Sequence, residues 1–129
     1  MTEPQYMKLE IFIPETHFRL LQEALQRVDA GHIGGYDSCL AYSRVTGMWR
    51  PLAGASPYHG NVGVVSEGAE LKVEVRIKAV HLEKTLSAIR TVHPYEEPVI
   101  FALPLSMDDR KILAPDGRSR YTTSQQIML

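Results

Sequence analysis

The chain has 129 residues, of which 44% are hydrophobic and 22% charged, and its net charge at pH 7 is −1. This length predicts one domain with its own core, and the near-neutral charge gives no electrostatic basis for binding nucleic acid. Cys39, the only cysteine, excludes an internal disulfide and fits a reducing cytoplasm. The start of the chain lacks the pattern of a signal peptide, and no apolar run approaches the roughly 20 residues that cross a bilayer. We therefore expect a cytoplasmic protein without a nucleic acid or a membrane as partner.

The first half of the chain predicts a strand, a helix and a glycine-rich loop. Residues 7–13 alternate between apolar and other side chains, which indicates a strand with one buried face. Over residues 16–29, apolar side chains recur at helical spacing, and Thr16 is placed to cap the helix. Three glycines between 31 and 35 then indicate positive φ angles or close backbone approach, with Gly31 ending the helix.

The middle of the chain is less regular. Residues 36–43 predict a weak second strand, and residues 44–69 read as one long connection rich in Gly and Pro. A loop this long in a compact domain is usually functional or part of an oligomer contact. Trp49, which needs apolar cover, and His59 both lie in it.

The second half of the chain predicts a strand, a helix and a further strand. Residues 71–80 form the clearest strand, residues 81–92 a helix, and residues 98–105 a last strand. The order β-α-β-β-α-β predicts an α+β fold: a ferredoxin-like sandwich with two helices on one face of a four-stranded antiparallel sheet. This domain is expected to span residues 1–105, and the polar tail at 106–129 to pack on it or on a neighbouring subunit.

The two faces of the predicted sheet differ in chemistry. The helices are expected to cover the face that carries Leu9, Ile11, Val73, Val75 and Phe101. The opposite face mixes charged and apolar side chains, and such faces are commonly closed by a partner. We therefore expect a homo-oligomer, with a trimer favoured over a dimer. The members of this second face are Lys8, Glu10, Phe12, Glu74, Arg76 and Ile100.

The most concentrated chemistry lies in the segment HPYEEP at 93–98, between the second helix and the last strand. Its prolines make a stiff corner that holds an imidazole, a phenol and two carboxylates. If the backbone there is extended, Glu96 and Glu97 point to opposite sides, so only one can join His93 in a site. We expect the two helices to run roughly parallel, which places this corner near the 31–36 loop at the same end of the sheet.

These expectations predict a shallow polar site. Imidazole and carboxylate side chains suit Zn²⁺ or a similar divalent metal ion, whereas glycine amides suit an anion. The alternative is structural: a glutamate of the corner accepts hydrogen bonds from the glycine loop and locks two corners together. The candidate metal ligands are His93, Glu96, Glu97, His32 and His59, and the candidate ligand-binding residues are Gly34, Gly35, Tyr36 and Tyr95.

Three segments in this order and spacing resemble one known family: GHIGGYDSC at 31–39, GMWRP to PYHG between 47 and 60, and HPYEEP at 93–98. Together they are similar to the CutA-like, PII-like domain inserted in YqfO-type members of the Nif3-like family, which is also found as a stand-alone protein. The resemblance covers roughly residues 7–105 and implies a ferredoxin-like domain that commonly assembles as a trimer. The two-metal site of Nif3-like proteins belongs to the larger domain around the insert, so the resemblance implies no reaction for this chain.

Three functions are consistent with these observations. The first is a non-catalytic module that binds a small ligand or a metal ion. The second is a structural oligomerisation module without a ligand. The third is an enzyme that uses Cys39 as nucleophile, with His93 or His32 as base. We favour the first of the three.

Overall fold

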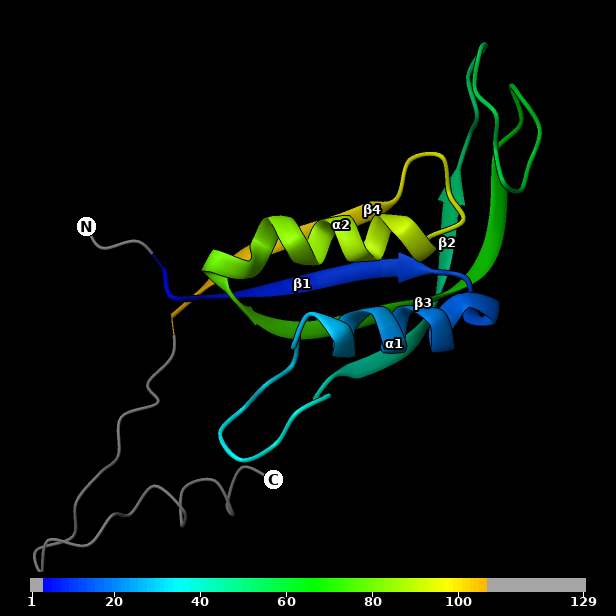
Figure 1. The fold of residues 1–129 in the computed structure, drawn as a ribbon. Helices are drawn as coiled ribbons and strands as arrows, with labels where there is room; N and C mark the ends of the chain where they lie inside the picture. The colour runs from blue at the N-terminus through cyan, green and yellow to red at the C-terminus, as the bar shows by residue number, and fades with distance from the viewer. Residues whose placement is uncertain (1–3, 107–129) are drawn as a thin grey trace, which may run out of the picture.

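The computed structural model describes residues 4–106, in which two helices pack on one face of a four-stranded antiparallel sheet (Figure 1). The strand order β2-β3-β1-β4 and the element order confirm the predicted ferredoxin-like sandwich. The predicted packing of the 106–129 tail lies outside the described residues. The elements are β1 (Tyr6–Ile13), α1 (Phe18–Arg27), β2 (Ala41–Trp49), β3 (Ser66–Lys78), α2 (Leu82–Val92) and β4 (Val99–Leu105), and a 3-10 turn precedes each helix, at Glu15–His17 and Ala79–His81.

The core lies between the helices and the centre of the sheet. Alternate residues of β1 and β3 are buried, as the sequence predicts, and α1 adds Leu21 and Leu25. Leu9, Ile11, Val73 and Val75 are at most 3% exposed. Each stabilises the fold by roughly 1.5–3 kcal/mol. Thr16 does not cap α1, because the 3-10 turn precedes that helix and the Thr16 hydroxyl meets the neighbouring His17 ring instead.

The prediction for β4 was wrong by one residue in the choice of face. Phe101 pairs with Glu10 and Ile100 with Ile11, and directly paired residues of antiparallel strands share a face. Phe101 is therefore on the sheet face that the helices do not cover, which we call the open face, and is 53% exposed. Ile100 packs against the core. The cause is that β4 is apolar at nearly every position, so that its alternation does not show which side is buried.

The predicted second strand was also misplaced. β2 begins at Ala41 and runs to Trp49, because the backbone of residues 31–39 is used in loop hydrogen bonds. Ile33 and Tyr36 bond to each other across Gly34-Gly35, and Cys39 N–H donates to the carbonyl of Gly31. The predicted 44–69 connection shrinks accordingly to 50–65. With the strand ends beside it, it forms a projection beyond the helices, residues 47–68, which we call the arm (Figure 1).

The two helices run antiparallel, contrary to our expectation (Figure 1). β1 and β3 are antiparallel, and each helix turns back along the strand that it follows. The end of α1 therefore meets the end of β3, where Gly31 N–H donates to Arg76 O at 2.8 Å. The end of α2 meets the opposite end of β1, at Phe12. Arg76 pairs with Lys8, four residues before Phe12, so the two corners are separated by about 13 Å of strand at 3.3 Å per residue.

Among the residues that the structure describes, neither helix is long and apolar enough to cross a membrane.

Candidate functional site

His93 anchors the corner that follows α2. It is buried, and its Nε2–H donates to the carbonyl of Phe12 at 2.7 Å. Its Nδ1 accepts the backbone N–H of Tyr95 at 3.2 Å, which assigns the ring proton to Nε2. Burial lowers the pKa of His93, although the Phe12 carbonyl opposes that effect. Because both nitrogens are engaged, His93 shapes the corner and has no lone pair left for a metal ion.

Tyr95 links the corner to β3. Its ring centroid lies 4.7 Å from that of His93 and 5.7 Å from that of Tyr58 in the arm. Its hydroxyl donates to Glu70 Oε2 at 2.8 Å. Burial raises the pKa of Tyr95, and the hydrogen bond and charge of Glu70 raise it further. Tyr95 therefore stays a neutral donor at physiological pH.

Two glycines make room for this arrangement. Gly47 and Gly68 are paired across β2 and β3. A Cβ atom at Gly47 would collide with Glu70 Oε1, and one at Gly68 would lie 3.0 Å from Trp49 Cη2. Because neither residue has a side chain, Glu70 can lie against one strand and the Trp49 indole can cross the other.

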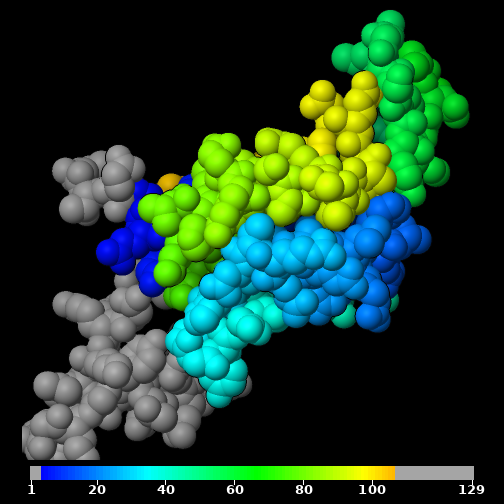
Figure 2. Space-filling model, viewed as in Figure 1, coloured from blue at the N-terminus to red at the C-terminus, as the bar shows by residue number. Residues whose placement is uncertain are grey.

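The arm and the corner are joined by polar contacts. Trp49 Nε1–H donates to the carbonyl of His59 at 2.9 Å, which closes the arm on itself. Ser56 N–H donates to Glu96 Oε2 at 2.8 Å, which ties the arm to the corner. Figure 2 shows the arm standing above the body of the domain, with the corner at its base.

A cavity of about 400 Å³ lies between the arm and the corner. Both Glu96 and Glu97 line it, because the backbone bends at these two residues, so that the alternation of an extended segment does not apply. Four aromatic rings, counting the His59 imidazole, and three carboxylates share its wall. The lining residues are Met48, Trp49, Arg50, Pro51, Leu52, Ala55, Pro57, Tyr58, His59, Glu70, Tyr95, Glu96, Glu97 and Val99.

The structure brings only part of the predicted site together. Of the candidate residues, those that line the cavity are His59, Tyr95, Glu96 and Glu97, and His93 lies beneath them. The others, His32, Gly34, Gly35 and Tyr36, lie in the loop after α1. The predicted approach of His93 to His32 was therefore wrong, because antiparallel helices end at opposite ends of the sheet.

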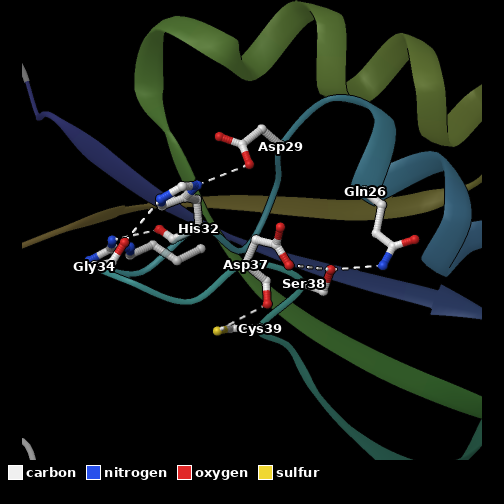
Figure 3. A network of polar contacts seen from close by, with 8 residues as sticks. Gln26, Asp29, His32, Gly34, Asp37, Ser38 and Cys39 are labelled. Carbon is white, nitrogen blue, oxygen red and sulfur yellow. Dashed lines mark hydrogen bonds and ion pairs between the residues drawn. The ribbon is translucent and has the colours of Figure 1, made fainter.

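The loop after α1 forms a polar network of its own (Figure 3). His32 Nδ1 lies 3.1 Å from Asp29 Oδ1, and Nε2 lies 3.0 Å from the carbonyl of Gly34. The hydrogen bond and charge of Asp29 raise the pKa of His32. Gln26 donates to the Ser38 hydroxyl, which fastens the loop to α1. In residues 4–106, no three His, Cys, Asp or Glu side chains are grouped so that they could hold a metal ion.

Sequence reasoning missed Glu70 and did not assign the aromatic wall. Glu70 reads as one more charged residue before the clearest strand. The available signal was the pair of glycines, because glycine within a strand marks a close approach of another group. Trp49 was correctly expected to need cover, and it packs across Gly68 in the arm.

The chain is similar in sequence to a segment of several known proteins. No family model matches the chain. A protein of Halalkalibacterium halodurans named GTP cyclohydrolase 1 type 2 homolog is 40% identical over 105 residues, which are 81% of this chain and 28% of that protein. A protein of the same name from Mycobacterium leprae is 42% identical over 98 residues, 74% of this chain and 26% of that protein. The chain thus spans about a quarter of the length of these curated relatives.

Solved structures of similar proteins lead to the same group of relatives and to the same fold. A Bacillus cereus protein related to NIF3 matches with a TM-score of 0.72 and 32% identity, over 83% of this chain and 27% of that chain. CutA1 from Shewanella sp. SIB1 matches with a TM-score of 0.63 at 14% identity, over 83% and 87% of the two chains, and therefore shows likeness of fold. GlnK of B. subtilis matches with a TM-score of 0.56 at 20% identity, over 79% and 86%. The chain therefore shares the ferredoxin-like fold of CutA1 and GlnK and is homologous to one segment of the proteins named GTP cyclohydrolase 1 type 2 homolog and of the B. cereus protein related to NIF3.

Proposed function

We propose that the chain is a non-catalytic module that binds a small molecule in the cavity between the arm and the corner. The observation that carries this proposal is the cavity itself. Its volume of about 400 Å³ lies in the range of roughly 300–1,000 Å³ that small-molecule sites occupy. Its wall combines aromatic surface with a few fixed polar groups, as such sites do.

The alternatives have less support. As an enzyme, the domain would need its nucleophile hydrogen-bonded to a base, but the Cys39 thiol points to the Asp37 carbonyl at 3.7 Å. The two ring nitrogens of His32, in the same loop, lie against Asp29 and the Gly34 carbonyl. His93 is at the other end of the sheet, with both ring nitrogens engaged. A divalent metal ion in the cavity would need donors from His59, Glu96 and Glu97, which line it, but no three His, Cys, Asp or Glu side chains of residues 4–106 are grouped so that they could hold one.

The cavity can be tested by filling it. Ala55 lines the cavity, whereas Ala53, two residues away in the same loop, is exposed and does not line it. The neutral, environment-sensitive dye Nile red serves as probe. We expect saturable dye binding by the wild type and by Ala53→Phe, and its loss in Ala55→Phe. Equal binding by Ala55→Phe, or no saturable binding by the wild type, would refute the proposal. A parallel Zn²⁺ titration of EDTA-treated protein tests the metal alternative.

We further propose that a second copy of the chain covers the open sheet face, with a trimer as the favoured assembly. Val99, Phe101 and Leu103 of β4 are 45%, 53% and 40% exposed on that face. Phe12 packs edge-on against Phe101, with ring centroids 5.9 Å apart, so the apolar surface continues onto β1. Beside it lies a charge ladder that includes Lys72 with Glu10 at 3.5 Å. An apolar stripe next to paired charges suits contact with another protein surface.

A further inference from the structure

We propose that the ligand of the cavity is an organic cation, namely a protonated amine or a quaternary ammonium group. This inference rests on the proposed function and adds to it the chemical class of the ligand. It follows from the position of the aromatic rings, from the balance of charge in the wall and from the absence of convergent metal donors among the described residues.

Aromatic rings line the cavity in two pairs. Tyr58 and Tyr95 lie with their ring centroids 5.7 Å apart and their planes at 50°. Trp49 and His59 lie 5.6 Å apart at 60°. All four line the same space. The face of an aromatic ring carries negative potential and attracts a cation within about 6 Å of its centroid, most strongly for Trp and also for Tyr.

The charged groups of the wall have the matching sign. Glu70, Glu96 and Glu97 line the cavity, and Arg50 is the one Lys or Arg among the lining residues. Glu70 and Glu96 are held in place by hydrogen bonds from Tyr95 and Ser56. Within residues 4–106, neither Glu97 nor Arg50 has an ion-pair partner. The wall is therefore acidic, and a bound cation would reduce the repulsion among its carboxylates.

The same geometry argues against two other kinds of ligand. A metal ion needs several donors at about 2.0–2.2 Å from one point, and the described residues contain no such group. An anion would face a net negative wall, and the glycine-rich loop that could offer amides is at the other end of the sheet. A quaternary ammonium group needs no convergent ligand atoms, because its charge is spread over a surface that rings and distant carboxylates can cover together. A protonated amine can also donate hydrogen bonds to those carboxylates.

The test compares two molecules of nearly the same shape. Choline carries a quaternary ammonium group, and 3,3-dimethyl-1-butanol replaces it with an uncharged tert-butyl group. Trp49 is the single tryptophan of the chain, so its indole N–H gives one NMR cross-peak that reports from the cavity wall. We expect saturable shifts of this peak and affinity for choline about two- to thirtyfold higher than for the alcohol, the range of a cation–π contribution.

A matched pair of variants tests the charge of the wall. Glu97→Gln should weaken choline binding about two- to fivefold, as expected for loss of one exposed charge, and leave alcohol binding unchanged. Glu83→Gln changes an exposed glutamate of α2 that does not line the cavity, and it should alter neither. Equal affinity for both probes, or choline binding unaffected by Glu97→Gln, overturns the inference. If neither probe binds while Nile red does, the cation is wrong and the cavity stands. If the dye fails as well, the proposed function is refuted.

Discussion

The hydroxyl of Tyr95 lies 2.8 Å from Glu70 Oε2, and this hydrogen bond joins the corner after α2 to β3 at the base of the arm. Glu70 lies against the backbone of Gly47 in the neighbouring strand, so three separate segments meet at one carboxylate. His93 supports the same corner from beneath by accepting the Tyr95 N–H. The hydrogen bond between Tyr95 and Glu70 therefore joins two residues of the cavity wall.

Removing the Tyr95 hydroxyl should destabilise the domain measurably. Tyr95→Phe leaves the partly buried Glu70 carboxylate without this donor, and we expect a loss of about 1–3 kcal/mol in the free energy of unfolding. Urea denaturation followed by circular dichroism measures it. Tyr36→Phe is the matched control, because Tyr36 is 64% exposed and its change should stay within about 0.5 kcal/mol. Equal losses in both variants would show that the bond to Glu70 contributes nothing.

A methyl group at Gly47 should break the same bond from the other side. The new Cβ would displace the Glu70 carboxylate, so Gly47→Ala and Tyr95→Phe should be less than additive in the double variant. We expect a coupling energy of about 0.5–3 kcal/mol, the range for residues in one network. Gly35→Ala is the control, since a Cβ there meets nothing within 4 Å. Strict additivity of the urea-derived values would contradict this account of the glycine.

The sequence was sufficient to predict the fold, for physical reasons that particular residues make clear. β1 and β3 alternate cleanly because one face is buried and the other charged, so Leu9 and Val73 were placed correctly. β4 has apolar side chains on both faces, and its alternation could not show whether Ile100 or Phe101 is buried. The start of β2 was misjudged because residues 36–40 alternate like a strand while their backbone bonds within a loop.

The site was only half predictable. The HPYEEP corner was predicted to be the centre of the chemistry, and Tyr95, Glu96 and Glu97 line the cavity. The segment that faces the corner across the cavity depends on the direction of the helices. Because we assumed parallel helices, we predicted the His32 loop there, whereas the structure places the arm there. Glu70 was missed because its partner lies 25 residues away in the sequence, and spacing along the chain does not reveal such a contact.

The two perturbed histidines should give opposite pH dependences. Burial lowers the pKa of His93 below 6.5, so its neutral form contributes stability above that pH, which is lost as the pH falls below about 6.5. Asp29 raises the pKa of His32, so its contribution is present at low pH and is lost as the pH rises above about 6.5. NMR titration of the two rings measures both pKa values directly. A His93 pKa at or above that of His32 would contradict the assignment of their surroundings.

The open face gives a prediction about assembly. Phe101→Asp places a charge in the middle of the exposed apolar stripe on β4, where it should prevent a second copy from packing without disturbing the core. We expect light scattering to show an oligomer for the wild type and a monomer for the variant, with nearly unchanged circular dichroism. Val80→Asp is the control, because Val80 is 87% exposed in the turn before α2. A wild-type monomer at micromolar concentration, or an oligomer that survives Phe101→Asp, would exclude this face as the interface.

The loop after α1 offers a last prediction, which separates backbone strain from steric conflict. Gly31 has a φ of +79°, and a Cβ there would collide with the carbonyl of Cys39 and lie 2.9 Å from its nitrogen. Gly54 has a φ of +91° with nothing within 4 Å of a Cβ. Gly54→Ala should therefore cost about 1–2 kcal/mol from the left-handed backbone alone, whereas Gly31→Ala should cost more. It must also break the hydrogen bond between Cys39 N–H and the Gly31 carbonyl, worth about 1 kcal/mol. Urea denaturation of both variants beside Gly35→Ala decides the order, and a Gly31→Ala cost no larger than that of Gly54→Ala would show that the close approach of Cys39 relaxes freely.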